Sequence, residues 1–215
     1  MNTTVDPGAS YVFVRAACVW SQQAFIKASN TGGDDRFGSA LALGKDRLVV
    51  GARTEDGESA GINGDQNDNN APDAGAVYIF SRTGAMWAQE AYVKASNPDP
   101  YDYFGSAVSM FGDMIAVGAF AEDSSGVGLG ASQQSEGDPS AGAVYLFGRA
   151  QNGWSQVGYL KALNSDTSDE FGKSLALSGN TLVCGAHQED SQFSGVNVNP
   201  YNEGAGDSGA VYVYH

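Results

Sequence analysis

The feature that most constrains this chain is an internal repeat with a period of 67. The dipeptide Phe-Gly begins at positions 37, 104 and 171, and the dipeptide Gly-Ala begins at positions 51, 118 and 185. The same step separates three tryptophans (Trp20, Trp87, Trp154) and three lysines (Lys27, Lys94, Lys161). The chain is therefore expected to be a single array with repeats 8–74, 75–141 and 142–208, and with 209–215 starting a further repeat.

Each period predicts four short β-strands. In the first period these are segments 37–43, 47–53, 75–82 and 87–96, which alternate large and small or polar side chains or carry β-branched pairs such as Val49 and Val50. Gly, Asp, Asn and Ser between them favour turns, and no window shows a helical stripe. Four strands per repeat are typical of a β-propeller blade. A stacked β-solenoid is the alternative, although its repeats are usually shorter.

Counting the strands raises a question of closure. If a blade begins at Phe-Gly, the chain holds two strands of one blade, two full blades and three strands of another, or 13 strands in all. Closed propellers typically have four to eight blades. Either the chain is an excerpt of a longer propeller, or copies associate and their unpaired strands complete shared blades. Two copies would give four full and two composite blades, with a surplus third strand at each junction.

Composition excludes several classes of function. The chain has 11 Lys and Arg against 25 Asp and Glu, for a formal net charge of −14. Nucleic acids and anionic membrane surfaces require a basic face, so neither is an expected partner. No apolar run reaches the roughly 20 residues of a membrane helix, which excludes membrane insertion by a helix. Two cysteines do not make a disulfide scaffold, and the first residues show no signal peptide.

Residues that recur in every repeat are assigned to the scaffold. Phe37, Phe104 and Phe171 are predicted to fill the space between blades, and Gly51, Gly118 and Gly185 belong to the same structural set. Trp20, Trp87 and Trp154 are predicted to cap the outer strands, with a stacked sugar platform as the alternative. The recurring Lys, Asp and Glu-Asp positions predict a repeated turn in which Asp accepts backbone hydrogen bonds and Lys pairs with a carboxylate. A ring of cation-binding carboxylates is the alternative.

The variable segments are the candidate sites. Segments 57–74, 124–141 and 191–208 are equal in length and should emerge on one face of the array. Loops as long as these are usually functional or mobile. The first carries Asp65, Asp68 and Asp73 among several Asn, and these three are candidate binding residues. Asp65 and Asp68 are also the candidates for binding calcium. The third carries Phe193 and Tyr201, which are candidates for contacting a partner.

The sequence carries few of the motifs that are typical of enzymes. The chain has two histidines, His187 and His215, and no nucleophile elbow, His-x-x-x-His pair or Cys-x-x-Cys pair. The Glu-Asp pairs recur in every repeat, whereas a catalytic carboxylate pair normally occurs once. We therefore expect a protein that is not an enzyme. The sequence indicates no definite cofactor, although it leaves calcium open.

Phe-Gly followed some fourteen positions later by Gly-Ala resembles the FG-GAP repeat, which builds the seven-bladed propeller of integrin alpha subunits and many bacterial surface proteins. The stretch from Glu55 to Tyr78 is similar to secreted bacterial arrays. The proline that follows Gly-Ala in the family is replaced here by Arg53, Phe120 and His187. The family's calcium loop has no counterpart in links 44–47, 111–114 and 178–181, which have too few oxygen side chains.

The resemblance implies a non-catalytic binding or adhesion module, extracellular or periplasmic, whose long loops contact a protein or glycan. Three alternatives stay open. The chain is a structural subunit that binds its own copies through blade edges, an accessory propeller of a larger secreted enzyme, or a calcium-dependent lectin.

Overall fold

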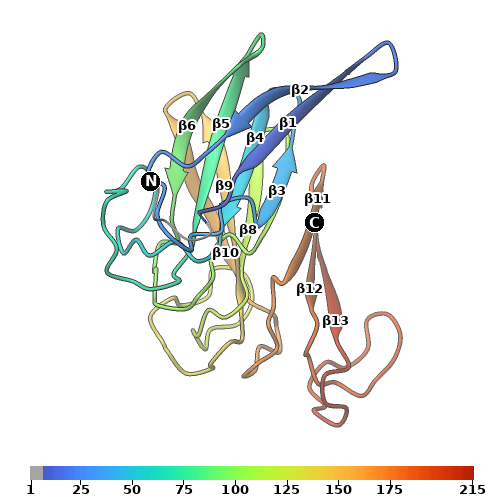
Figure 1. Ribbon diagram of the computed structural model, residues 1–215. Helices are drawn as coiled ribbons and strands as arrows, with labels where there is room; N and C mark the ends of the chain where they lie inside the picture. Colours follow the sequence, from blue (N-terminus) through green and yellow to red (C-terminus); the bar gives the residue numbers. More distant parts are fainter. Residues whose placement is uncertain (1–6) are drawn as a thin grey trace.

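The computed structural model describes residues 7–215, which form strands and no α-helix (Figure 1). No helix with the length and hydropathy of a membrane span occurs in that range. The strands are β1 (Ser10–Ala16), β2 (Val19–Ile26), β3 (Ala40–Leu43), β4 (Arg47–Ala52), β5 (Ala76–Thr83), β6 (Met86–Val93), β7 (Ala107–Phe111), β8 (Met114–Ala119), β9 (Ala143–Ala150), β10 (Gly153–Leu160), β11 (Ser174–Ser178), β12 (Thr181–Ala186) and β13 (Ala210–Tyr214).

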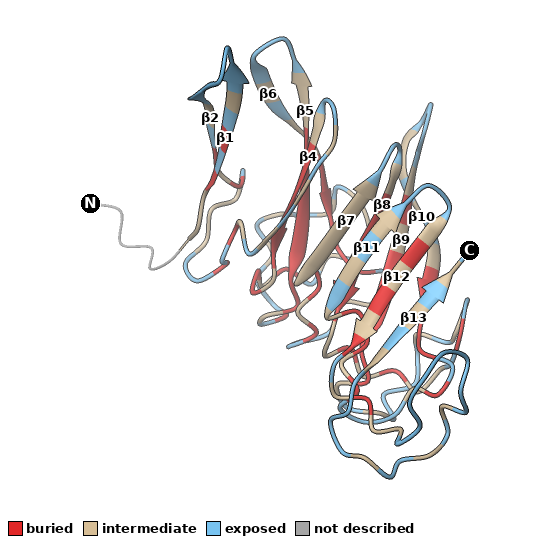
Figure 2. Cartoon of the chain, turned by 90° about the vertical axis from the view of Figure 1, so that its right-hand side faces the viewer, coloured by how far each residue is buried: buried red, intermediate tan, exposed pale blue. Residues whose placement is uncertain are grey.

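These 13 strands form four antiparallel sheets in which each strand pairs with its neighbours along the chain. The sheets are β1–β2, β3–β4–β5–β6, β7–β8–β9–β10 and β11–β12–β13. They follow one another in chain order, with the β1–β2 hairpin at one end and the three-stranded sheet at the other (Figure 2). The all-β prediction of a partial propeller with about three blades is confirmed.

The blades share one geometry because the repeat keeps their register. The β5–β6 hairpin has a β-bulge between Ile79 and Phe80, and the β1–β2 hairpin has its bulge one period earlier, between Val12 and Phe13. A bulge adds one residue to one strand and bends it at that point. The β1–β2 hairpin therefore already has the shape of the outer half of a blade.

The first strand of each blade begins later than the sequence pattern predicted. Strand β3 starts at Ala40, whereas the alternation had placed its start at Phe37. The Phe-Gly dipeptide lies instead in a turn, in which Ser39 N donates to Arg36 O at 3.0 Å and Gly38 has a φ of 98°. Glycine reaches this φ at low cost because it lacks a Cβ.

The core lies between successive sheets. One buried cluster joins the β1–β2 hairpin to the first four-stranded sheet, a second joins the two four-stranded sheets, and a third joins the last two sheets. Phe37, Phe104 and Phe171 are buried, one in each cluster. Their rings make edge-on contacts with Tyr78, Tyr145 and Tyr212, each at a centroid distance of 5.3 Å. Apolar burial between blades is thus what joins one repeat to the next.

The tryptophans reach across to the preceding blade. Trp87 Nε1 donates to Gln23 Oε1 at 3.0 Å, and Trp154 Nε1 donates to Glu90 Oε1 at 3.2 Å. Trp20 has no preceding blade within the described residues and is exposed. The three tryptophans therefore lie at outer strands and differ in burial according to their place in the array.

Candidate functional site at the loop end of the blades

The three long loops project from one end of the blades, the lower end in Figure 1. Each joins the second strand of a blade to the third, so that they follow β4, β8 and β12. The segments before β3, β7 and β11 reach the same end, because antiparallel first strands begin where second strands finish. We call this region the loop end. It gathers variable residues from every blade.

A buried ion pair anchors the first loop. Glu55 lies shortly beyond the end of β4, and its Oε2 accepts hydrogen bonds from Lys94 Nζ at 3.0 Å and Gly57 N at 2.9 Å. Its Oε1 accepts from Tyr92 Oη at 2.8 Å and from Asn30 Nδ2 at 3.1 Å. The side chains of Lys94 and Glu55 are 0% and 1% exposed. Four donors on one carboxylate offset the cost of removing both charges from water.

The same network links one blade to the next. Asn30 follows β2, and while its amide nitrogen donates to Glu55, its Oδ1 accepts from Tyr78 Oη on β5 at 2.6 Å. A single asparagine from one sheet thus satisfies two buried polar groups of the following sheet. Buried polar groups that are fully paired fix one arrangement, since a shifted arrangement would leave them without partners.

The second blade repeats the arrangement around Glu122. This carboxylate accepts hydrogen bonds from Lys161 Nζ at 2.9 Å, Asn97 Nδ2 at 3.0 Å and Ser124 Oγ at 2.7 Å, and Tyr145 Oη donates to Asn97 Oδ1 at 2.7 Å. Burial by itself would raise the pKa of Glu122, but the nearby ammonium of Lys161 and the hydrogen bonds from Ser124 and Lys161 outweigh burial and lower it. Glu122 is therefore held as a carboxylate.

A second recurring carboxylate supports the turn before each Phe-Gly. Asp35, Asp102 and Asp169 are buried, and each accepts a hydrogen bond from a backbone N–H one turn earlier. Burial is the main reason that their pKa values rise, to about 6, about 8 and about 7 respectively. This is the repeated turn that the sequence pattern predicted. It also places a group that titrates near neutral pH at the base of every loop.

The predicted calcium candidates lie in the first loop and support its own turns. Asp65 Oδ1 accepts from the backbone N of Asn67 at 2.9 Å. Asp68 accepts from Ser59 Oγ at 3.1 Å and from Asn70 N at 3.2 Å. Over residues 7–215 no three His, Cys, Asp or Glu side chains gather as metal ligands would. Calcium binding at Asp65 and Asp68 stays a prediction.

The other predicted residues lie in different places. Phe193 and Tyr201 are exposed on the third loop, 49% and 68% respectively, and contact by a partner stays a prediction. Asp73 lies at the end of the first loop, where its backbone N donates to Asp56 Oδ1 at 2.9 Å. Among the five binding candidates, Asp73 lines a cleft of the loop end.

This cleft has a volume of about 590 Å³ and lies between the first two blades. It is lined by Asp34, Arg36, Arg53, Thr54, Asp73, Tyr103 and Phe120. A neighbouring cleft of about 380 Å³ shares three of these side chains and extends to the third blade, being lined by Arg36, Ser39, Arg53, Ser106, Phe120 and Lys173. We call the two together the arginine cleft.

The arginine cleft carries a stack of aromatic rings with cations beside them. Tyr103 and Phe120 are parallel, with centroids 5.1 Å apart and an interplanar angle of 4°. The Arg53 guanidinium lies 6.0 Å from the Tyr103 centroid, and Lys173 Nζ lies 3.2 Å from the Phe120 centroid. Cations over ring faces are attracted by the ring quadrupole. The stack joins residues of all three blades.

The two arginines differ from most other cations of the chain. Arg47, Arg82 and Arg149 form ion pairs with carboxylates, and Lys94 and Lys161 form the buried pairs. Within residues 7–215, neither Arg36 nor Arg53 lies within ion-pair distance of a carboxylate. Their charges still act on Asp73: its pKa is raised chiefly by burial, and both arginines oppose that rise. The guanidinium donors are thus available to a ligand.

The arginine cleft was not predicted from the sequence, although a signal for it was present. The position after Gly-Ala is Arg53, Phe120 and His187 in the three repeats, and the position before Phe-Gly is Arg36, Tyr103 and Glu170. Both positions vary between the repeats, whereas the neighbouring Gly-Ala and Phe-Gly motifs are the same in every repeat. The first variation is a departure from the family pattern, and nothing in the sequence shows that these residues line one surface.

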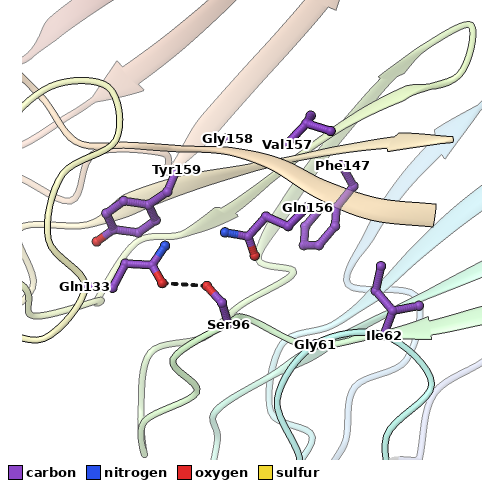
Figure 3. Close-up of a pocket in the computed structure, with 9 residues that line it drawn as sticks. All are labelled: Gly61, Ile62, Ser96, Gln133, Phe147, Gln156, Val157, Gly158 and Tyr159. Atoms are coloured by element: carbon purple, nitrogen blue, oxygen red, sulfur yellow. Dashed lines mark hydrogen bonds between the residues drawn. The ribbon is translucent and has the colours of Figure 1, made fainter. Parts of the chain in front are cut away.

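A second hollow, of about 580 Å³, lies between the first loop and the outer strand of the second blade (Figure 3). Gly61 and Ile62 form one side, and residues of β10 from Gln156 to Tyr159 form the other. Ser96 Oγ donates to Gln133 Oε1 at 2.6 Å on its floor. Its lining is neutral, so it offers shape and hydrogen bonds without a charge to orient a ligand.

Four-stranded antiparallel sheets in sequence, with apolar cores between them and variable loops at one end, define a β-propeller array. The FG-GAP repeat family matches this chain three times, at residues 20–80, 87–147 and 154–214. These matches cover most of the chain, which belongs to the FG-GAP repeat family. They follow one another with the period of the internal repeat, although each match begins at the tryptophan rather than at the Gly-Ala-Val-Tyr segment.

A comparison with curated proteins found no match.

Proposed function

We propose that this protein is a non-catalytic binding module that holds a protein or glycan ligand at its loop end. One observation carries the proposal. The arginine cleft is built from positions that vary between blades, whereas the recurring positions serve the scaffold. A scaffold role would call for the same residue in each blade, since each blade makes the same packing contacts. Arg36, Arg53, Tyr103 and Phe120 therefore have another role to serve.

The chemistry of the cleft indicates the kind of group that it would hold. A guanidinium presents planar paired N–H donors that match a carboxylate or a sulfate. The Tyr103–Phe120 stack offers an apolar face that suits a sugar ring or an apolar side chain. We therefore propose a ligand that presents an acidic group beside an apolar face. Residues of the long loops, among them Phe193 and Tyr201, would make further contacts.

The proposal includes an extracellular or periplasmic location. The resemblance to surface and secreted arrays supports it, and the net charge of −14 would keep the module soluble in salt. Fractionation of the source cells with an antibody to the protein tests this location. Recovery in the cytosol alone would contradict it.

Binding to a panel of uronic-acid and sulfated oligosaccharides, neutral oligosaccharides and acidic peptides tests the cleft. We expect Arg53→Ala to weaken binding of the acidic probe at least tenfold, because a charge-assisted hydrogen bond is lost. Arg82→Ala is the matched control, since Arg82 lies at the opposite end of the blade and pairs with Asp46 at 3.1 Å. Equal losses in both variants, or a preference for neutral probes, would argue against the cleft.

A further inference from the structure

The two ends of the array carry complementary halves of the buried ion pair. Glu189 occupies the position of Glu55 and Glu122 and is 1% exposed, but it is held by Asn164 Nδ2 and Ser191 Oγ, each at 2.8 Å, with no lysine. Lys27 occupies the position of Lys94 and Lys161, but it is only partly buried and donates to the backbone carbonyl of Gly8. Among residues 7–215, one end thus holds a buried carboxylate without its cation and the other a cation without its carboxylate.

The β1–β2 hairpin has the form of a blade's outer half and an unpaired edge. Its register and bulge match those of β5–β6, one period later. In the complete blade, β5 pairs with both β4 and β6, whereas in the part of the chain that the structure describes β1 pairs with β2 alone. Tyr11 and Phe13 on β1 are 56% and 52% exposed, while their equivalents Tyr78 and Phe80 are 0% and 5% exposed. The hairpin thus presents a face that other blades bury.

Strand β13 forms an edge of the last sheet. It has five residues, and within residues 7–215 it pairs with β12 alone and has no fourth strand beside it. Val211 and Val213 are 68% and 55% exposed, while their equivalents Val77 and Ile79 are 1% exposed. When the repeats are aligned, β13 and β1 occupy equivalent positions in their blades, so Tyr212 corresponds to Tyr11. An edge strand with exposed apolar side chains invites pairing or replacement.

We propose that two copies of this chain associate by strand replacement. The β1–β2 hairpin of one copy docks on β12 of the other copy in the place of β13, and Lys27 then lies against Glu189. This goes beyond the proposed ligand binding and does not depend on it. The hairpin brings with it the fourth strand that the last sheet lacks. Charge complementarity between the two ends is the main argument for a second copy as the occupant.

The contacts of the junction follow from those already present. Tyr212 now pairs with Cys184 across the sheet, donates from its Oη to Asn164 Oδ1 at 2.7 Å, and contacts the Phe171 ring. Tyr11 of the second copy would take over all three contacts. Lys27 would reach Glu189 as Lys161 reaches Glu122. The buried carboxylate of Glu189 would then have a cation to pair with.

Reciprocal replacement closes a ring. Each copy contributes two complete four-stranded sheets, and each junction makes a composite blade of β11 and β12 from one copy with β1 and β2 from the other. The pair would form six blades, within the usual range of closed propellers. Replacement of β13 also removes the surplus third strand that simple addition of copies would leave. The displaced segment is residues 209–215.

Light scattering after size exclusion tests the proposal with matched charge variants. We expect the wild-type chain to form a species of twice 22.3 kDa. Lys27→Glu and Glu189→Lys should each raise the dimer dissociation constant at least 100-fold, because each places like charges together at a buried site. An equimolar mixture of the two variants should recover the dimer, since each junction again joins one cation to one carboxylate. Lys45→Glu, at an exposed turn, is the control and should change nothing.

A cross-link tests the register independently of the charge pair. Cys184 is a buried free thiol on β12 and would stand opposite Tyr11 of the second copy. In a Cys18→Ser background, Tyr11→Cys should form an intermolecular disulfide on oxidation, because Cα atoms of opposed residues lie about 4.5–5.5 Å apart. Phe13→Cys should not, since it would face Leu182. Deletion of 209–215 should strengthen association by removing the competing strand.

A wild-type chain that stays at 22.3 kDa at all concentrations, with no cross-link from Tyr11→Cys, overturns the proposal. That result would assign these surfaces to a further repeat in a longer chain. A dimer that survives Lys27→Glu, or that cross-links through Phe13→Cys instead, would also overturn it, because the copies would then meet in another way.

Discussion

At the scale of single residues, the aspartate at the base of each loop makes stability depend on pH. Asp102 is 2% exposed, and its pKa is raised from 3.8 to about 8, chiefly by burial and further by Glu122, Asp99 and Asp123. The folded state therefore binds its proton more tightly than the unfolded state does. The contribution of Asp102 to the free energy of unfolding is fully present below pH 3.8 and is lost as the pH rises through about 8. Asp102→Asn keeps an oxygen for the Asp99 N–H and carries no charge. We expect the variant to be more stable than the wild type by a few kcal/mol at pH 8, at about 1.4 kcal/mol per pKa unit, and by much less at pH 5. Urea unfolding at the two pH values measures this. Asp207→Asn, on the exposed third loop, should show no such pH dependence, and an equal gain in both variants would refute the role of burial.

At the scale of elements, a glycine at the start of each third strand sets how closely blades approach. A Cβ on Gly142 would lie 2.2 Å from Phe171 O in the next blade, whereas a Cβ on Gly209 would lie 3.2 Å from its nearest atom, His187 O. Both glycines have a positive φ, 81° and 76°. Gly209→Ala should therefore cost the backbone strain, roughly 1–2 kcal/mol, together with a small shift of the His187 carbonyl. Gly142→Ala should cost at least about 2 kcal/mol more in urea unfolding, because the third blade must also move away. Equal costs would mean that backbone conformation alone selects glycine there. These elements also show how far the sequence can be interpreted. Periodicity revealed the blades, their order and the recurring turns, because each signal lies within one repeat. The arginine cleft was not predicted, since Arg53, Tyr103 and Lys173 come from three blades and meet only when the blades stack.

At the scale of the whole molecule, the array behaves as a row of units that contact only their neighbours, since each buried cluster joins one sheet to the next. A row of this kind should tolerate the loss of one whole period but not of a part of one. Deletion of 75–141 removes one whole period and joins Ala74 to Gly142, which keeps the local sequence because an alanine, Ala141, also precedes Gly142 in the intact chain. We expect this shortened chain to fold with the same β-sheet signal per residue by circular dichroism. Its urea unfolding should show a smaller free energy and an m-value lower by roughly a third, since less surface is buried. Deletion of 50–115, which is one residue short of a whole period, is the control. It joins Val49 of β4 to Ala116 of β8 and so inserts one residue into a buried strand, which turns the side chains that follow to the opposite face of the sheet and should leave the chain unfolded or aggregated. If both deletions folded equally well, the blades would tolerate a change of register in their central strand. If neither folded, the array would depend on contacts beyond nearest neighbours.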